Sequence, residues 1–254
     1  MADITGDGLW FRRYRPTPDA PVRLVCLPHA GGAASFFAPL ARACSPRLEV
    51  LAVQYPGRQD RRAEPPVTDL RQLADRVCEV LDASDDGRPY ALFGHSMGAV
   101  LGYEVTRRME ARGCGPVELF ASGSRAPSLA PRRERLPVTD EELVDGLREL
   151  DGTTAALLDD PEVLRMILPA LRADYAAALG YRHRGRPGVA CPVTALTGDG
   201  DPYVAVPEAR AWEGLTPGGF RLRVLPGGHF FLVDRQDEVL RTVEERLVGV
   251  PAVS

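Results

Sequence analysis

Short runs of apolar residues recur along the chain, and segments with helical spacing of apolar positions separate them. The runs with strand composition are residues 22–27, 48–53, 90–93, 117–122, 191–196 and 220–225. Apolar positions repeat with helical spacing over residues 68–82, 97–111 and 236–247. Continuous apolar strands that alternate with helices are typical of a parallel sheet covered on both faces. We therefore predict an open, mostly parallel α/β sheet.

The alternation stops between about residues 127 and 187, where no strand pattern occurs. Thr139 and Glu142 form a capping box that predicts the start of a helix. A second helical pattern covers residues 160–179, and Pro169 inside it should kink or split that helix. Helices inserted between two sheet strands have the form of a lid over an active site, or of a plain helical subdomain.

The insertion divides the chain in two. We assign residues 1–126 and 188–254 to the core and residues 127–187 to a helical lid insertion. The Pro/Arg-rich residues 125–137 have the composition of a hinge into the lid.

Composition limits the chemistry. The 254 residues, 44% of them hydrophobic, suffice for one large domain or a domain with an insertion. A net charge of −4 gives no reason to expect a nucleic-acid partner. All 31 basic residues are arginine, so a phosphate-loop lysine and a Schiff-base lysine are excluded.

The five cysteines are scattered and lack the close spacing of metal sites or disulfide frameworks. The first residues lack the apolar core of a signal peptide, and no apolar run reaches the roughly 18 residues of a membrane span. We expect a soluble, cytoplasmic protein that is a monomer and needs no metal or cofactor.

A candidate nucleophile lies where a predicted strand meets a helix. Residues 94–98 read Gly-His-Ser-Met-Gly, the pattern G-x-S-x-G in a strand–turn–helix context. The glycines let neighbouring backbone approach the turn without a Cβ clash. Ser96 is therefore the candidate nucleophile, the alternative being a serine that only caps the helix.

A serine nucleophile needs a base, and the chain has four histidines. His95 adjoins the serine and should point away from it, and His183 lies in a basic stretch expected at the surface. His29 and His229 follow the first and last strands, whose carboxyl ends should converge on one crevice. In the α/β-hydrolase arrangement the acid and then the histidine follow the serine, so only His229 fits as the base.

The loop at residues 29–32, His-Ala-Gly-Gly, has the composition of an oxyanion-binding loop. An acyl-transfer intermediate needs two backbone N–H donors, one from the residue after the nucleophile and one from an early strand–helix loop. Met97 and Ala30 are the predicted donors. The alternative is an ordinary loop whose glycines only turn the chain.

Several ordered motifs together resemble the type II thioesterases, discrete α/β-hydrolases that accompany polyketide synthases and nonribosomal peptide synthetases. The chain is also similar to the medium-chain thioesterase partner of fatty acid synthase. Gln54, where many members have leucine, and Thr197 are small departures that leave the chemistry intact. The motifs that carry the resemblance are residues 27–37, 54–66, 91–105, 197–204 and 225–232.

The resemblance implies a triad of Ser96, Asp201 and His229, with oxyanion amides at Ala30 and Met97. It implies a serine hydrolase that releases aberrant or stalled acyl groups from the phosphopantetheine arm of acyl or peptidyl carrier proteins, beneath a helical lid. The preference for a thioester over an ester or amide rests on the resemblance alone.

Two aspartates compete for the role of the acid. Pro202 holds Asp201 out of the α region and helps to fix an extended turn from which the carboxylate can reach the histidine. Asp199 lies between two glycines and fits a turn former that binds nearby backbone amides. We therefore favour Asp201.

Three other functions fit the same features less well. A carboxylesterase or lipase would prefer oxygen esters, an acyltransferase would pass the acyl group to an alcohol or amine, and a carrier-binding module would not need an intact triad. A domain cut from a multienzyme is disfavoured by the apparent native start and the short C-terminus. Two arginine clusters are candidate contacts for an acidic carrier protein, although exposed arginines are usually solvated: Arg58, Arg61 and Arg62, and Arg132, Arg133 and Arg135.

Overall fold

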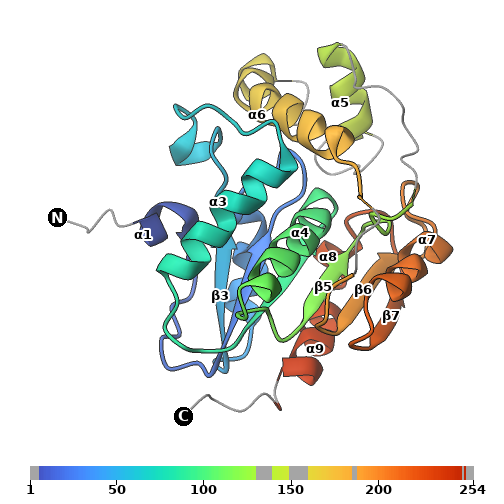
Figure 1. Cartoon of the computed structure of the whole chain (residues 1–254). Helices are drawn as coiled ribbons and strands as arrows, with labels where there is room; N and C mark the ends of the chain where they lie inside the picture. Colours follow the sequence, from blue (N-terminus) through green and yellow to red (C-terminus); the bar gives the residue numbers. More distant parts are fainter. Residues whose placement is uncertain (1–5, 130–138, 149–159, 185–187, 248, 250–254) are drawn as a thin grey trace.

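A seven-stranded sheet in the order β1-β3-β2-β4-β5-β6-β7 forms the centre of the computed structural model, which describes residues 6–129, 139–148, 160–184, 188–247 and 249 (Figure 1). The pairs from β3 to β7 are parallel, and β1 joins β3 antiparallel. The predicted α/β sheet is confirmed. Strand β1 was not predicted, because its two residues are too few to show an apolar strand pattern. The strands are β1 (Phe11–Arg12), β2 (Val22–Leu27), β3 (Leu48–Val53), β4 (Tyr90–His95), β5 (Leu119–Ser122), β6 (Val193–Gly198) and β7 (Phe220–Leu225).

Helices cover both faces of the sheet because the strand residues alternate between two apolar cores. Val25 and Leu27 of β2 pack under α3 (Leu70–Ala83) and α4 (Met97–Ala111). Leu24 and Cys26 point to the opposite core. That second core is closed by α2 (Ala38–Ala43), α8 (Phe231–Asp234) and α9 (Gln236–Leu247). The remaining short elements are α1 (Gly6–Trp10), α7 (Val206–Arg210) and the 3-10 turns Ala34–Phe37, Gln59–Arg61 and Ala211–Leu215.

Between β5 and β6, the described residues form two helices and no strand: α5 (Asp140–Arg148) and α6 (Pro161–Gly180). Both lie beyond the carboxyl ends of the strands (Figure 1). Thr139 Oγ1 accepts the Glu142 N–H at 3.2 Å, as the capping box predicts. Of the two effects predicted for Pro169, a kink or a split, the split does not occur, because α6 continues through the proline. A proline removes one backbone bond, and the packing of α6 against α5 and α3 supports the remainder.

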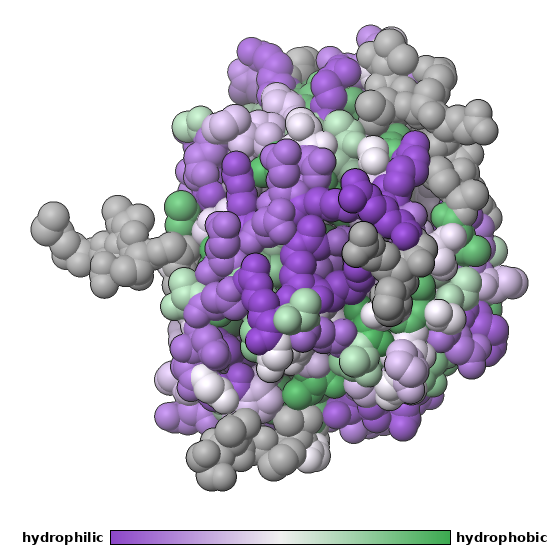
Figure 2. Space-filling view, in the orientation of Figure 1, coloured by the Kyte–Doolittle hydropathy of each residue, from purple (hydrophilic) through white to green (hydrophobic). Residues whose placement is uncertain are grey.

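The face that carries α3 and α4 is predominantly hydrophilic (Figure 2). Ion pairs cross the outer sides of these helices, among them Arg108 with Asp75 and Arg112 with Asp82. This is the amphipathic pattern of helices that pack on a sheet by one side only. Among the described residues, no helix is long and apolar enough to cross a membrane.

Candidate active site

Ser96 lies on a strained turn between β4 and α4. Its φ and ψ of 55° and −115° are rare for a residue with a side chain. The chain can turn so sharply because Gly94 and Gly98 flank the serine: a Cβ on Gly94 would lie 2.1 Å from the Gly98 carbonyl oxygen. The Ser96 N–H donates to the Ser122 carbonyl at 2.8 Å, which anchors the turn to β5. The turn presents the hydroxyl at the carboxyl edge of the sheet, as G-x-S-x-G predicts.

His229 and Asp201 form a buried hydrogen-bonded pair beside this turn. His229 Nδ1 lies 2.8 Å from Asp201 Oδ2. A carboxylate only accepts, so Nδ1 carries the proton of this bond, and Asp201 leaves Nε2 of the ring unengaged. The other Asp201 oxygen accepts the N–H groups of Tyr203 at 2.8 Å and Val204 at 3.2 Å. These backbone donors hold the carboxylate against the ring.

Asp199 makes a different contact. Its Oδ1 accepts the Gly227 N–H at 3.0 Å, and the Gly200 N–H donates to the Gly227 carbonyl at 2.9 Å. Asp199 therefore binds a backbone amide as predicted, but the amide belongs to a different loop and not to its own turn. The amide is 28 residues away, so Asp199 ties the loop after β6 to the loop that carries His229.

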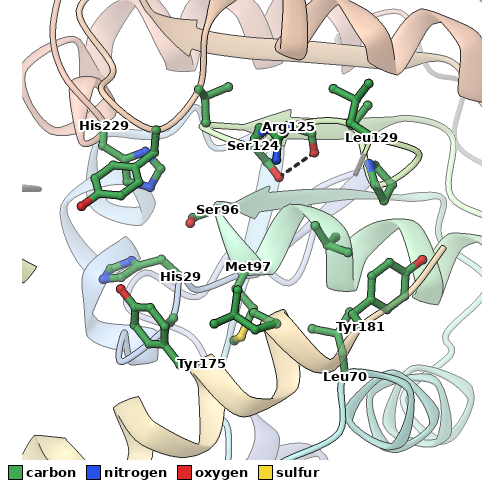
Figure 3. Close-up of a pocket in the computed structure, with 18 of the residues that line it drawn as sticks. His29, Leu70, Ser96, Met97, Ser124, Arg125, Leu129, Tyr175, Tyr181 and His229 are labelled. Atoms are coloured by element: carbon green, nitrogen blue, oxygen red, sulfur yellow. Dashed lines mark hydrogen bonds between the residues drawn. The ribbon is translucent and has the colours of Figure 1, made fainter. Parts of the chain in front are cut away.

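A cavity of about 590 Å³ opens beside Ser96. Ser96, Met97, Ala30 and His229 all line it, so the structure brings these predicted residues together around one space. Figure 3 shows Ser96 between His229 and His29 at one end, with Leu70 and Tyr181 at the other. Within the described part of the chain, no hydrogen bond joins the Ser96 hydroxyl to His229. The other apolar lining residues include Val100, Ala126, Leu129, Ala178, Leu179 and Val204.

The two predicted oxyanion donors lie within three residues of the ends of β4 and β2. Met97 is the first residue of α4, where a backbone N–H has no partner within the helix. Ala30 follows β2 in the loop at residues 29–32. Both residues line the cavity that opens beside Ser96, and their role as oxyanion donors stays a prediction.

The other histidines differ in their surroundings. Burial, and to a lesser extent the nearby His229 and Arg58, lowers the pKa of His29 to about 3. His95 is fully buried with Nδ1 3.0 Å from Ser122 Oγ, and burial lowers its pKa well below the ordinary value. His183 was predicted at the surface, but it is half-buried, lines the cavity and contacts the Tyr103 hydroxyl at 3.1 Å. Tyr103 of α4 lies 80 positions away, so a local basic pattern could not reveal the contact.

Two of the three arginines in the first candidate cluster for carrier docking are not at the surface. Arg58 and Arg61 are buried: Arg58 pairs with Asp174 of α6, and Arg61 pairs with Glu64 and lies over the Trp10 ring. Of this cluster only Arg62 is exposed. The second cluster, at residues 132, 133 and 135, lies outside the described residues. Within the described part of the chain, no group of three His, Cys, Asp or Glu side chains could hold a metal ion.

Comparisons with known proteins identify relatives over nearly the whole chain. Residues 22–247 match the thioesterase domain family. The chain is 46% identical over 242 residues to thioesterase PikA5 of Streptomyces venezuelae, covering 95% of this chain and 86% of that protein. It is 48% identical over 239 residues to a probable cadicidin biosynthesis thioesterase of Streptomyces griseus, covering 94% of this chain and 66% of that protein. Its structure resembles that of the type II thioesterase BorB from the borrelidin biosynthetic cluster, with 50% identity, a TM-score of 0.85 and coverage of 94% and 98% of the two chains.

Proposed function

The chain belongs to the thioesterase domain family. We propose that its substrates are the thioesters that join acyl groups to the phosphopantetheine arm of acyl or peptidyl carrier proteins. Two of its relatives are named as thioesterases of biosynthetic systems, one for cadicidin and one from the borrelidin cluster, and this supports the proposal. In such a pathway the reaction clears aberrant or stalled acyl groups in the cytoplasm.

The buried pair of His229 and Asp201 beside Ser96 carries this proposal. The pair supplies an oriented base, the strained turn supplies the nucleophile, and both line one cavity. A serine hydrolase needs these parts together at the edge of a substrate cavity.

The first half of the reaction acylates Ser96. His229 Nε2 takes the hydroxyl proton as Oγ attacks the thioester carbonyl carbon. The oxygen of the tetrahedral intermediate accepts the Ala30 and Met97 N–H groups. The C–S bond then breaks, His229 gives its proton to the sulfur, and the phosphopantetheine thiol leaves.

The second half releases the acid. A water molecule gives a proton to His229 and attacks the acyl carbonyl, and the oxygen again rests on the Ala30 and Met97 amides. The bond to Oγ breaks and the imidazolium returns its proton to Ser96. Asp201 orients the ring and stabilises its positive charge in both halves.

The cavity suits an acyl chain better than a charged substrate. Beyond Ser96 its wall is mostly apolar, with Leu70, Val100 and Leu179 along it. A chain of methylene groups gains about 0.8 kcal/mol for each CH₂ removed from water. The binding energy therefore comes from the acyl group, and the thioester is placed at the polar end.

One comparative assay tests the proposal. Wild type and Ser96→Ala are incubated with acetyl-, propionyl- and longer acyl-carrier proteins, the matching acyl-CoAs and a p-nitrophenyl ester. Ser124→Ala is the matched control, because Ser124 lines the same cavity, its hydroxyl donates to the Arg125 carbonyl, and its bond with Trp212 is made by the backbone carbonyl, which the substitution keeps.

We expect turnover of the carrier thioesters to fall at least about 1,000-fold in Ser96→Ala and to persist in Ser124→Ala. Turnover of the oxygen ester alone would refute the carrier substrate. Equal rates for wild type and Ser96→Ala would refute the assignment of the nucleophile.

A further inference from the structure

A single carboxylate of α6 reaches the loop that carries Ala30. Asp174 is 1% exposed, and its Oδ2 accepts the Gly31 N–H at 2.7 Å. The same oxygen accepts Arg58 Nη1 at 2.9 Å, and Oδ1 accepts Arg58 Nη2 at 2.9 Å. The helix beyond the strand ends is thus bonded directly to the 29–32 loop.

Arg58 holds the loop from the other side. It is 5% exposed, and its Nη1 also donates to the Gly32 carbonyl at 3.0 Å. Its guanidinium lies 5.0 Å from the centre of the Tyr55 ring. Asp174 therefore fixes a donor of the loop and Arg58 fixes an acceptor one residue later, while the two side chains neutralise each other's charge.

These contacts select one conformation of the turn. The Gly32 N–H donates to the His29 carbonyl at 2.9 Å and closes a β-turn over residues 29–32. Gly31, at the third position, has a φ of +75°, which a type II turn requires there. Type I and type II turns differ in the orientation of the central peptide, whose N–H belongs to Gly31. By accepting that N–H, Asp174 fixes the type II form.

The placement of the whole turn sets where the Ala30 amide points, since the bond from the Gly32 N–H to the His29 carbonyl fixes the first peptide of the turn. In a trans peptide the carbonyl and the N–H point opposite ways, so the His29–Ala30 peptide carries the turn's acceptor on one side and the Ala30 N–H on the other. Leu171 of α6 also packs against this turn, since a Cβ on Gly31 would lie 2.8 Å from its Cδ1. A change in the position of α6 would therefore move the loop.

We infer that Asp174 and Arg58 are positioning residues for catalysis. Through them, the position of α6 determines the orientation of the oxyanion donor at Ala30. The inference rests on the proposed function, because it needs the Ala30 amide to bind the oxyanion. Among the described residues that line the cavity, neither Asp174 nor Arg58 occurs, whereas Tyr175, the next residue of α6, does. Their effect therefore acts through the loop.

Asp174→Asn is the first test. The asparagine keeps the shape but has one acceptor oxygen, and its NH₂ group faces a donor of Arg58. We expect kcat for an acyl-carrier thioester to fall about 10- to 100-fold, because an oxyanion donor is misplaced rather than removed, with KM changed less than about threefold. The Gly31 amide should exchange with solvent faster and its proton NMR signal should move upfield.

Glu118→Gln is the matched control. Glu118 is 2% exposed and pairs with Arg246 at 2.7 Å, and it also accepts the Thr194 hydroxyl. It precedes β5 (Leu119–Ser122), at the end of the sheet opposite the cavity. Glu118→Gln should lower Tm as Asp174→Asn does and leave kcat within about twofold of wild type. An equal fall in kcat in both variants would overturn the inference.

Wild-type kcat in folded Asp174→Asn would also overturn it. If that variant does not fold, Arg58→Lys decides: it keeps the charge but loses the two-pronged pair, and kcat should fall about 5- to 10-fold with an altered Gly31 signal. Wild-type kcat in folded Arg58→Lys would refute the inference. The proposed function is judged separately, by Ser96→Ala, so loss of turnover there with wild-type kcat in Asp174→Asn means that only the positioning role fails.

Discussion

The two walls of the cavity are built in different ways. Ser96, Asp201 and His229 each follow a sheet strand within four residues, and backbone hydrogen bonds hold their turns. The opposite wall comes from α6, which meets the 29–32 loop through the buried pair of Asp174 and Arg58, the bond from the Gly31 N–H to Asp174 and the packing of Leu171. Backbone bonds persist whatever the side chain, whereas the ion pair depends on two residues. In the first wall we therefore expect a large loss of turnover only when a reacting group is substituted. In the second wall we expect a loss when a residue that holds the loop is substituted.

The largest effect should come from Asp201→Asn on the first wall. The asparagine NH₂ group would donate to His229 Nδ1 and hold the imidazole in the wrong tautomer. By analogy with other Ser-His-Asp enzymes, kcat should fall about 10,000-fold while Tm stays close to that of wild type. Steady-state turnover of an acyl-carrier thioester and thermal unfolding measure the two quantities.

Asp199→Asn is the control for that experiment, because it changes the same group two residues away. Near-normal turnover in Asp201→Asn together with a collapse in Asp199→Asn would reverse the roles of the two aspartates.

Asp199→Ala should have an intermediate effect, because it removes a support of the first wall and no reacting group. The Gly227 N–H would lose its acceptor, while the bond from Gly200 to the Gly227 carbonyl remains. We expect unfolding to become easier by about 1 kcal/mol and kcat to fall less than about 10-fold. Denaturant unfolding and turnover test this, and a loss as large as that of Asp201→Asn would show that the histidine loop depends on one side chain after all.

Local patterns predicted the first wall well. The apolar spacing predicted α4 and α9 at their observed bounds, since each packs one face on the sheet. The glycines at 94 and 98 predicted the turn at Ser96, because neither position has room for a Cβ: one on Gly94 would meet the Gly98 carbonyl, and one on Gly98 would meet the Leu27 carbonyl of β2. The roles of Ser96, Asp201 and His229 in catalysis stay predictions, and the geometry around them is what such roles need.

The second wall could not be predicted in the same way. Asp174 lies 116 positions from Arg58 and 143 from Gly31, so no local period connects them. An aspartate in an amphipathic helix usually faces water, and a cluster of arginines usually does too. Only the folded chain shows that Arg58 and Asp174 neutralise each other inside the protein. The prediction for Arg58 failed because burial of a charge is decided by its partner.

The smallest effect is expected for His29, in the loop between the two walls, where the pH dependence of stability distinguishes the charge of the side chain from its packing. Burial holds the pKa of His29 near 3, against an ordinary value of 6.5 in the unfolded chain. Between these values the unfolded chain binds more protons, so the stability that neutral His29 allows is present above pH 6.5 and declines as pH falls toward 3. The loss from this residue should reach about 2 kcal/mol by pH 5.

His29→Gln should therefore lose less stability than wild type between pH 7 and pH 5, by roughly 4–8 °C in Tm. Phe36→Leu is the control: Phe36 packs against the His29 ring at 4.6 Å and carries no titratable group, so its Tm should be lower at both pH values with the wild-type slope. If His29→Gln kept the wild-type slope, the imidazole would be charged in the folded protein. Asp174 and Arg58 hold the loop without His29, so turnover at pH 7 should change far less in His29→Gln than in Asp174→Asn. That result would show that the ion pair, and not His29, fixes the conformation of the loop.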